Sequence, residues 1–190
     1  IIVLTDYGTQ LLDHGRFGKG ANQLQAYNTQ INWMLRHPDF PNGGRVSGFV
    51  QTHDLFPTLL VLLDIPYERV DGKDVWLLIT KKVEAVRDHV VIGWAANPNG
   101  TATGRASVRN DRWNYTVSLD NPEKQEELFD LISDPEEKVN VIADYLGVVS
   151  EQRKRLEVVI QQQLPAVFLE VCAHPVLGPG EQYARVKGNK

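Results

Sequence analysis

A short apolar run leads directly into a polar loop, and this change of character constrains the fold more than any other feature of the chain. The run is Ile1-Ile2-Val3-Leu4, and the loop extends from Thr5 to Lys19 with glycines at positions 8, 15 and 18. Consecutive aliphatic residues predict a strand buried on both faces, and we expect that strand to continue from sequence upstream of Ile1. The loop would then leave the carboxyl end of a strand, the edge of an open α/β sheet at which ligands bind.

Two side chains of this loop carry chemistry. Asp6 offers carboxylate oxygens, which suit Ca²⁺ or Mg²⁺, and Lys19 offers a positive charge that could hold an oxyanion bound to the same metal. The glycines let the backbone turn tightly and approach a ligand closely. On the residue types alone we favour a second interpretation, in which the aspartate helps a turn and the lysine is solvated.

The spacing of the loop is more specific than its composition. The loop reads Asp6-Tyr7-Gly8, then Leu11, His14-Gly15 and Phe17-Gly18-Lys19. This series resembles the late active-site segment of the sulfatase family, in the alkaline phosphatase superfamily, which often reads D-[HN]-G-x-x-L-G-[ED]-H-G-x-[WF]-G-K. The distance along the chain from the aspartate to the lysine is the same in both.

Two later stretches are similar to further segments of that family and come in the same order. One includes His53-Asp54-Leu55-Phe56-Pro57-Thr58, and the other includes Glu127-Leu128-Phe129-Asp130-Leu131 with Asp134-Pro135-Glu136-Glu137. The resemblance implies an α/β fold over residues 1–80, the C-terminal portion of an alkaline-phosphatase-like sulfatase catalytic domain. Residues 81–164 are expected to form a small α+β subdomain, an antiparallel sheet with one long helix. Residues 165–190 form a tail without an assigned role.

The same resemblance implies roles for four residues of the loop. Asp6 would coordinate the active-site divalent cation, most commonly Ca²⁺, and Lys19 would contact the sulfate group as a catalytic residue. Tyr7 stands where the family usually has histidine or asparagine, and its phenol is a bulkier and weaker oxygen donor, so it is the second candidate for the metal site. His14 matches the family pattern as a substrate-binding or a loop-structural residue, and we favour the structural role.

The family's nucleophile has no counterpart in this sequence. It is a formylglycine made from the cysteine or serine of a C/S-x-P-x-R segment, beside an Asp-Asp pair that completes the metal site. The one cysteine, Cys172, is followed by Ala173-His174-Pro175 and has no arginine in place. We therefore expect the formylglycine in a missing N-terminal half of the same fold, and we expect this chain alone to be inactive toward sulfate esters.

Three functions stay open on this reading. The leading one is a sulfuric ester hydrolase (sulfatase) acting on a sulfate ester. Phosphonate and phosphate ester hydrolases of the same superfamily share the loop and form the first alternative. A non-catalytic fragment or pseudoenzyme is the second, because Tyr7 departs from the family and the nucleophile segment is missing.

Composition excludes other classes of function. The formal net charge of −4 comes without any basic stripe, which argues against a nucleic-acid partner. The sequence holds no run of eighteen or more apolar residues, the length that would predict a membrane span.

Hydrophobic patterns predict the remaining elements. Strands are expected at 31–36, 89–94 and 127–131, with a hairpin of 105–109 and 113–119 around Asn110-Asp111. A helix capped by Thr52 or Asp54 is expected to bury its stripe of Leu55, Leu59, Leu62 and Leu63, with His53 structural rather than a metal ligand. A second helix, capped by Ser150, is expected to bury Leu156, Val159, Ile160 and Leu164. Residues 75–79 fit either a strand or a helix.

Overall fold

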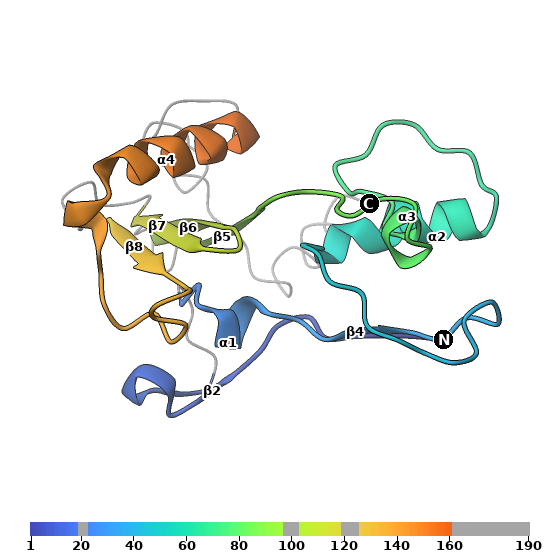
Figure 1. Ribbon diagram of the computed structural model, residues 1–190, viewed down its shortest axis with the longest axis horizontal. Helices are drawn as coiled ribbons and strands as arrows, with labels where there is room; N and C mark the ends of the chain where they lie inside the picture. The colour runs from blue at the N-terminus through green and yellow to red at the C-terminus, as the bar shows by residue number, and fades with distance from the viewer. Residues whose placement is uncertain (19–22, 97–102, 119–125, 161–190) are drawn as a thin grey trace, which may run out of the picture.

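The computed structural model describes residues 1–18, 23–96, 103–118 and 126–160. Figure 1 shows a sheet with helix α4 (Leu146–Ile160) on one side and the short helix α1 (Ala26–Thr29) on the other. Helices α2 (Leu55–Leu62) and α3 (Trp76–Ile79) lie together at the opposite end of the molecule. The mixture of helices and sheets is the expected α/β fold.

The sheet is an antiparallel meander of four strands in chain order. It consists of β5 (Val90–Ala96), β6 (Thr103–Arg109), β7 (Trp113–Ser118) and β8 (Glu127–Asp130). Asn110 makes the turn between β6 and β7, where its side-chain oxygen accepts the backbone N–H groups of Arg112 (3.0 Å) and Trp113 (2.7 Å). The strands predicted at 89–94 and 127–131, and the hairpin around Asn110 within the described residues, are therefore confirmed.

Strand β7 is buried on both faces, and the two faces differ in chemistry. Its apolar residues join the core beneath α4, which contains Ala106, Val108, Trp113, Tyr115, Val117, Leu128 and Leu156. The alternate residues Asn114 and Thr116 are polar and equally buried. Because successive side chains of a strand point to opposite faces, the sheet has an apolar face toward α4 and a polar face on its other side.

Helix α4 starts earlier than its sequence predicts. Residues Ile142–Asp144 form a short 3₁₀ turn, and the N–H of Val149 already donates to the carbonyl of Tyr145 over 3.1 Å. Ser150 therefore lies inside the helix and does not cap it, so that prediction is wrong. Leu156 is fully buried as expected, but Val159 is 53% exposed, and Leu164 lies outside the described residues.

The first strand forms as predicted but is not buried on both faces. Strand β1 (Ile2–Leu4) pairs antiparallel with β4 (Trp33–Leu35), and Val3 is 48% exposed. Among the described residues, β1 has no second neighbour, so one edge and much of its surface stay open. The following loop contains a small antiparallel pair, β2 (Gln10–Leu11) and β3 (Phe17–Gly18).

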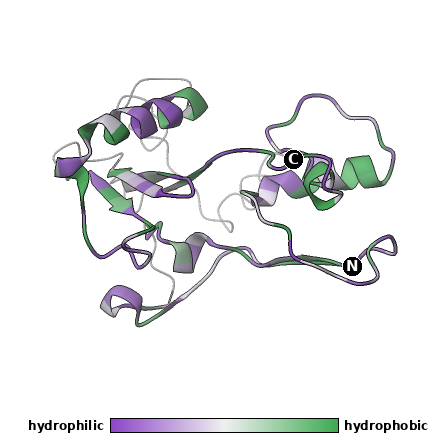
Figure 2. Ribbon diagram, in the orientation of Figure 1, coloured by the Kyte–Doolittle hydropathy of each residue, from purple (hydrophilic) through white to green (hydrophobic). Residues whose placement is uncertain are grey.

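Helix α2 also departs from the expected pattern of burial. A 3₁₀ turn at Thr52–Asp54 precedes it, and its buried residues are Pro57 and Thr58. Leu63, at the end of the predicted stripe, is 65% exposed, and Figure 2 shows a largely hydrophobic helix. The buried side faces α3, because the hydroxyl oxygen of Thr58 accepts the N–H of Val75 at its start over 3.0 Å. No helix within the described ranges is long and apolar enough to cross a membrane.

Candidate functional site

The loop after β1 exposes the two residues proposed for the metal site. Asp6 is exposed, and Tyr7 is 42% exposed. Both follow β1 directly, and the N–H of Thr5 donates to the carbonyl of Asn32 over 3.1 Å, which extends the pairing with the β4 side to the start of the loop. The fold therefore places the Asp6 carboxylate at the end of a strand and in contact with solvent, where it could bind a cation.

Gly8 is held against helix α1. Its N–H donates to the carbonyl of Asn28 over 2.8 Å. A Cβ atom at this position would lie 1.9 Å from the carbonyl oxygen of Tyr27, a distance at which backbone atoms would have to move. Glycine is therefore required here by the close approach of two backbone segments.

His14 contacts the far part of the chain. Its Nε2 lies 2.8 Å from the backbone carbonyl oxygen of Glu136, and since a carbonyl only accepts, Nε2 is the donor. The imidazole ring also lies 5.6 Å from the ring of Tyr27, measured between centroids. Burial raises the pKa of the Tyr27 phenol, and the carboxylates of Glu137 and Asp13 raise it further. The loop is therefore joined to the turn at Glu136 through His14, whose ring also lies near Tyr27.

Lys19, the predicted sulfate contact, lies outside the described residues. It follows β3 directly in the sequence. Strand β3 is paired with β2 through Gln10 and Gly18, so the described part of the loop reaches the residue before Lys19.

The described residues hold only part of a donor set for a metal ion. They contain no group of three or more histidine, cysteine, aspartate or glutamate side chains that could hold one. Ca²⁺ takes six to eight oxygen ligands in proteins, and Asp6 with Tyr7 would supply a minority of them. The chemistry of Asp6 fits such an ion, but its remaining ligands would have to come from elsewhere.

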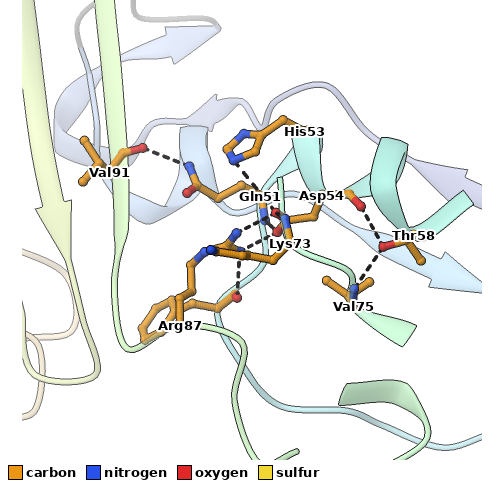
Figure 3. A network of polar contacts seen from close by, with 9 residues as sticks. Gln51, His53, Asp54, Thr58, Lys73, Val75, Arg87 and Val91 are labelled. Atoms are coloured by element: carbon orange, nitrogen blue, oxygen red, sulfur yellow. Dashed lines mark hydrogen bonds and ion pairs between the residues drawn. The ribbon is translucent and has the colours of Figure 1, made fainter. Parts of the chain in front are cut away.

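A second polar cluster surrounds Asp54, at the start of α2 (Figure 3). This carboxylate is fully buried, and it accepts the backbone N–H groups of Gln51 and Lys73, each over 2.7 Å. Arg87 donates to both of its oxygens. Burial raises the pKa of Asp54, but the Arg87 guanidinium and the two N–H groups outweigh it and hold the pKa below its usual range.

The contacts of the Asp54 cluster give it a structural role. Its carboxylate joins Gln51, Lys73 and Arg87 through hydrogen bonds, and His53 lies beside it with Nε2 3.9 Å from the nearer Asp54 oxygen. The side-chain amide of Gln51 donates to the carbonyl of Val91 over 2.9 Å, which ties the cluster to strand β5. The sequence pattern pointed to Asp54 as a cap, but it gave no sign of Arg87 as the partner.

The residues of the Asp134-Pro135-Glu136-Glu137 segment form a tight turn after β8. The Oδ2 atom of Asp134 accepts the N–H groups of Lys138 and Val139, each over 2.7 Å. The side-chain oxygen of Asn140 accepts the N–H of Leu128 over 3.0 Å. Sequence reasoning found these residues only as a family signature, whereas the contacts show that they shape the backbone beside His14.

Comparison with known proteins gives a consistent result. No family model matches the chain. Arylsulfatase K of Gallus gallus is 25% identical over 166 residues, which is 84% of this chain and 31% of that protein. A sulfatase of Formosa agariphila is 28% identical over 141 residues, 74% of this chain and 25% of that protein.

Solved structures show the same fold. A 2-O GAG sulfatase matches with a TM-score of 0.71 and 21% identity, over 96% of this chain and 43% of that chain. The chain thus spans less than half the length of each of these three proteins. Among the described residues, the loop after β1 contains the exposed carboxylates of Asp6 and Asp13 and the phenol of Tyr7, and it packs on α1.

Proposed function

Since this chain is related to sulfatases over most of its length and has part of their fold, we propose that it supplies the C-terminal part of a sulfuric ester hydrolase. The observation that carries the proposal is the loop after β1, which has the family spacing from Asp6 to Lys19 and leaves the end of a strand. Residues 1–80 would form the late part of the catalytic domain, and residues 81–164 the small subdomain beside it.

In this proposal each loop residue has one task. The Asp6 carboxylate would bind one side of a divalent cation, with Ca²⁺ as the expected ion, and Tyr7 would add a neutral oxygen. When bound, the cation would supply positive charge to the sulfate oxygens. Lys19 would place its ammonium group near the same oxygens and offset the charge that grows on the leaving oxygen, which stabilises the transition state more than the ground state.

The open surface of residues 1–80 supports the presence of further protein around the site. Apolar side chains of β1, β4 and α2 are exposed in the described chain, including Val3, Met34 and Phe56, and so is Leu63 directly after α2. An exposed apolar area of this kind marks a surface that packs against protein. The N-terminal half of the same fold would cover it and would supply the formylglycine and the missing metal ligands.

The test is an assay of the complete protein that contains this chain, with aryl sulfate and aryl phosphonate as parallel substrates. Turnover of the sulfate ester with Ca²⁺ present, and its loss after chelation, is the expected result. Preferential turnover of the phosphonate would favour the sister class of hydrolases. Absence of both activities, together with an unchanged melting temperature on adding Ca²⁺, would overturn the enzyme proposal in favour of a non-catalytic protein.

A further inference from the structure

We infer that the turn at residues 134–137 is a positioning device for the candidate loop, in which Glu137 anchors the turn to the sheet and the Glu136 carbonyl holds His14. The two partners are far apart in the sequence, and the hydrogen bond between them is 2.8 Å long. The catalytic consequence of this contact rests on the proposed function, whereas the contact itself does not.

Glu137 is anchored by a buried ion pair and a buried amide. The residue is 2% exposed, with Oε1 2.5 Å from an Arg109 nitrogen and Oε2 2.7 Å from the Asn114 amide nitrogen. Arg109 belongs to β6 and Asn114 to β7, so both oxygens are fixed to neighbouring strands. A buried carboxylate that loses such partners is costly, which makes this turn one of the firmly fixed parts of the polar face.

The backbone at Glu137 has an unfavourable conformation that these contacts maintain. Its φ is +57°, in the left-handed region that non-glycine residues rarely occupy. A strained backbone conformation persists where surrounding contacts enforce it. Here it is enforced by the contacts of the Glu137 carboxylate and by the hydrogen bonds that the Asp134 carboxylate accepts from the backbone. The direction of the preceding carbonyl, that of Glu136, is fixed by the same conformation.

The loop side of the contact is also strained locally. Leu12 and His14 have φ values of +78° and +49°, and the N–H of Leu11 donates to the Asp13 carboxylate over 2.8 Å. This short turn projects the imidazole toward Glu136 and brings the chain back into β3. The hydrogen bond to Glu136 therefore fixes the turn that connects Asp6 to the position of Lys19.

An alternative role for His14, direct contact with substrate through Nε2, would leave that nitrogen available for a ligand. In the described structure Nε2 is used by the Glu136 carbonyl and the ring packs near Tyr27. His14 is thus a positioning residue, which acts through the loop that it holds.

Amide hydrogen exchange on the full chain tests the contact directly. His14→Ala should speed exchange in residues 7–18 at least tenfold and leave exchange in the β6 and β7 strands unchanged. His14→Gln keeps an N–H donor of similar reach and should bring the rate within threefold of the wild type. Glu136→Ala is the matched control, because it keeps the backbone carbonyl and removes an exposed side chain, and it should change nothing.

Two further variants address the anchor. Glu137→Ala should speed exchange in both the 134–139 turn and the 7–18 loop, and Glu137→Gln should do so less. If Glu137→Ala fails to fold, the comparison of His14→Ala with His14→Gln still tests the inference. Unchanged loop exchange in His14→Ala, or equal exchange in His14→Ala and His14→Gln, would overturn the inference.

Activity provides the second readout in the complete protein. His14→Ala should lower kcat/KM for an aryl sulfate at least tenfold, and His14→Gln should restore most of it. A wild-type protein without turnover would overturn the proposed function and leave the exchange result as the test of the contact. An active protein whose kcat/KM is unchanged in His14→Ala would overturn the positioning role.

Discussion

Arg87 binds both carboxylate oxygens of Asp54, with Nη2 donating to Oδ1 over 2.6 Å and Nη1 donating to Oδ2. Asp54 stands at the start of α2, and Arg87 lies just before β5. The pair therefore joins the segment around α2 to the strand that opens the four-stranded sheet. Arg87 also donates to the carbonyl of Phe49 over 3.1 Å, so one side chain holds two parts of the polar cluster.

Removal of this arginine should destabilise the chain strongly. Arg87→Ala leaves the Asp54 carboxylate buried without its counter-charge, and we expect a loss of about 3–5 kcal/mol in the free energy of unfolding. Urea unfolding followed by circular dichroism would measure it. Lys138→Ala, which removes an exposed ion pair with Glu136, is the control and should leave the urea midpoint unchanged. Equal midpoints in the two variants would contradict the buried role of Arg87.

The same pair predicts a dependence of stability on acid pH. The folded state lowers the pKa of Asp54, so the unfolded state binds the proton more tightly. The contribution of Asp54 to stability is therefore complete above the unfolded value of about 4 and is lost as the pH falls through the folded value. Melting temperatures measured from about pH 6 to pH 2 should fall less steeply in Asp54→Asn than in the wild type. Parallel curves would contradict this assignment.

A methyl group at Gly8 should disrupt the candidate loop. In Gly8→Ala the new Cβ would meet the Tyr27 carbonyl oxygen at 1.9 Å, so the loop would have to leave α1. Exchange in residues 7–18 should rise, and the melting temperature should fall. Gly147→Ala in α4 is the matched control, because a Cβ there meets nothing within 4 Å, and it should be neutral or stabilise by about 0.5–1 kcal/mol.

Lys19 should matter for turnover and hardly for folding. In the complete protein, Lys19→Ala should lower kcat/KM for a sulfate ester by about a hundredfold or more, the usual effect of removing one group that stabilises transition-state charge. Lys154→Ala, on the exposed side of α4, should leave the rate unchanged. A decrease smaller than about tenfold, equivalent to 1.4 kcal/mol, would remove Lys19 from the proposed site.

Substitutions of Asp6 and Tyr7 should change the response of the melting temperature to calcium in opposite directions. Asp6→Asn should reduce the rise in melting temperature that Ca²⁺ causes in the complete protein, because a ligand that binds only the folded state raises the midpoint. Tyr7→Asn replaces a phenol by a stronger oxygen donor and should increase that rise. Asp111→Asn, at the exposed β6–β7 turn, is the control. Identical shifts in all three variants would exclude the loop as a calcium site.

Local patterns predicted the parts of the fold that depend on local chemistry. Asn110 marked the β6–β7 turn because its side chain can close that turn on its own backbone. Ser150 was a misleading cap, since the preceding 3₁₀ turn already starts the helix. The aliphatic run at Val3 predicted a strand correctly, but its burial depends on which other segments cover it.

The candidate site was predicted only as a set of loop residues. The spacing from Asp6 to Lys19 is a local property, whereas the contact of His14 with Glu136 spans 122 positions in the sequence. The partnership of Arg87 with Asp54 is similarly non-local, at 33 positions. The first contact depends on how the loop packs against the turn after β8, and the second on how the start of α2 packs against the segment before β5. Neither charge nor periodicity along the chain reports that packing.

The two chemically different faces of β7 have a consequence for how the sheet can assemble. Slippage of this strand by one residue would turn Asn114 toward Leu156 and the apolar core, and would turn Tyr115 toward the carboxylate of Glu137. Both misplacements are unfavourable, since one buries an amide without partners and the other removes the Tyr115 ring from the core and its hydroxyl from Glu126, to which it donates over 2.8 Å. An error in strand alignment is therefore penalised twice, which allows a single pairing of the strands to prevail during folding.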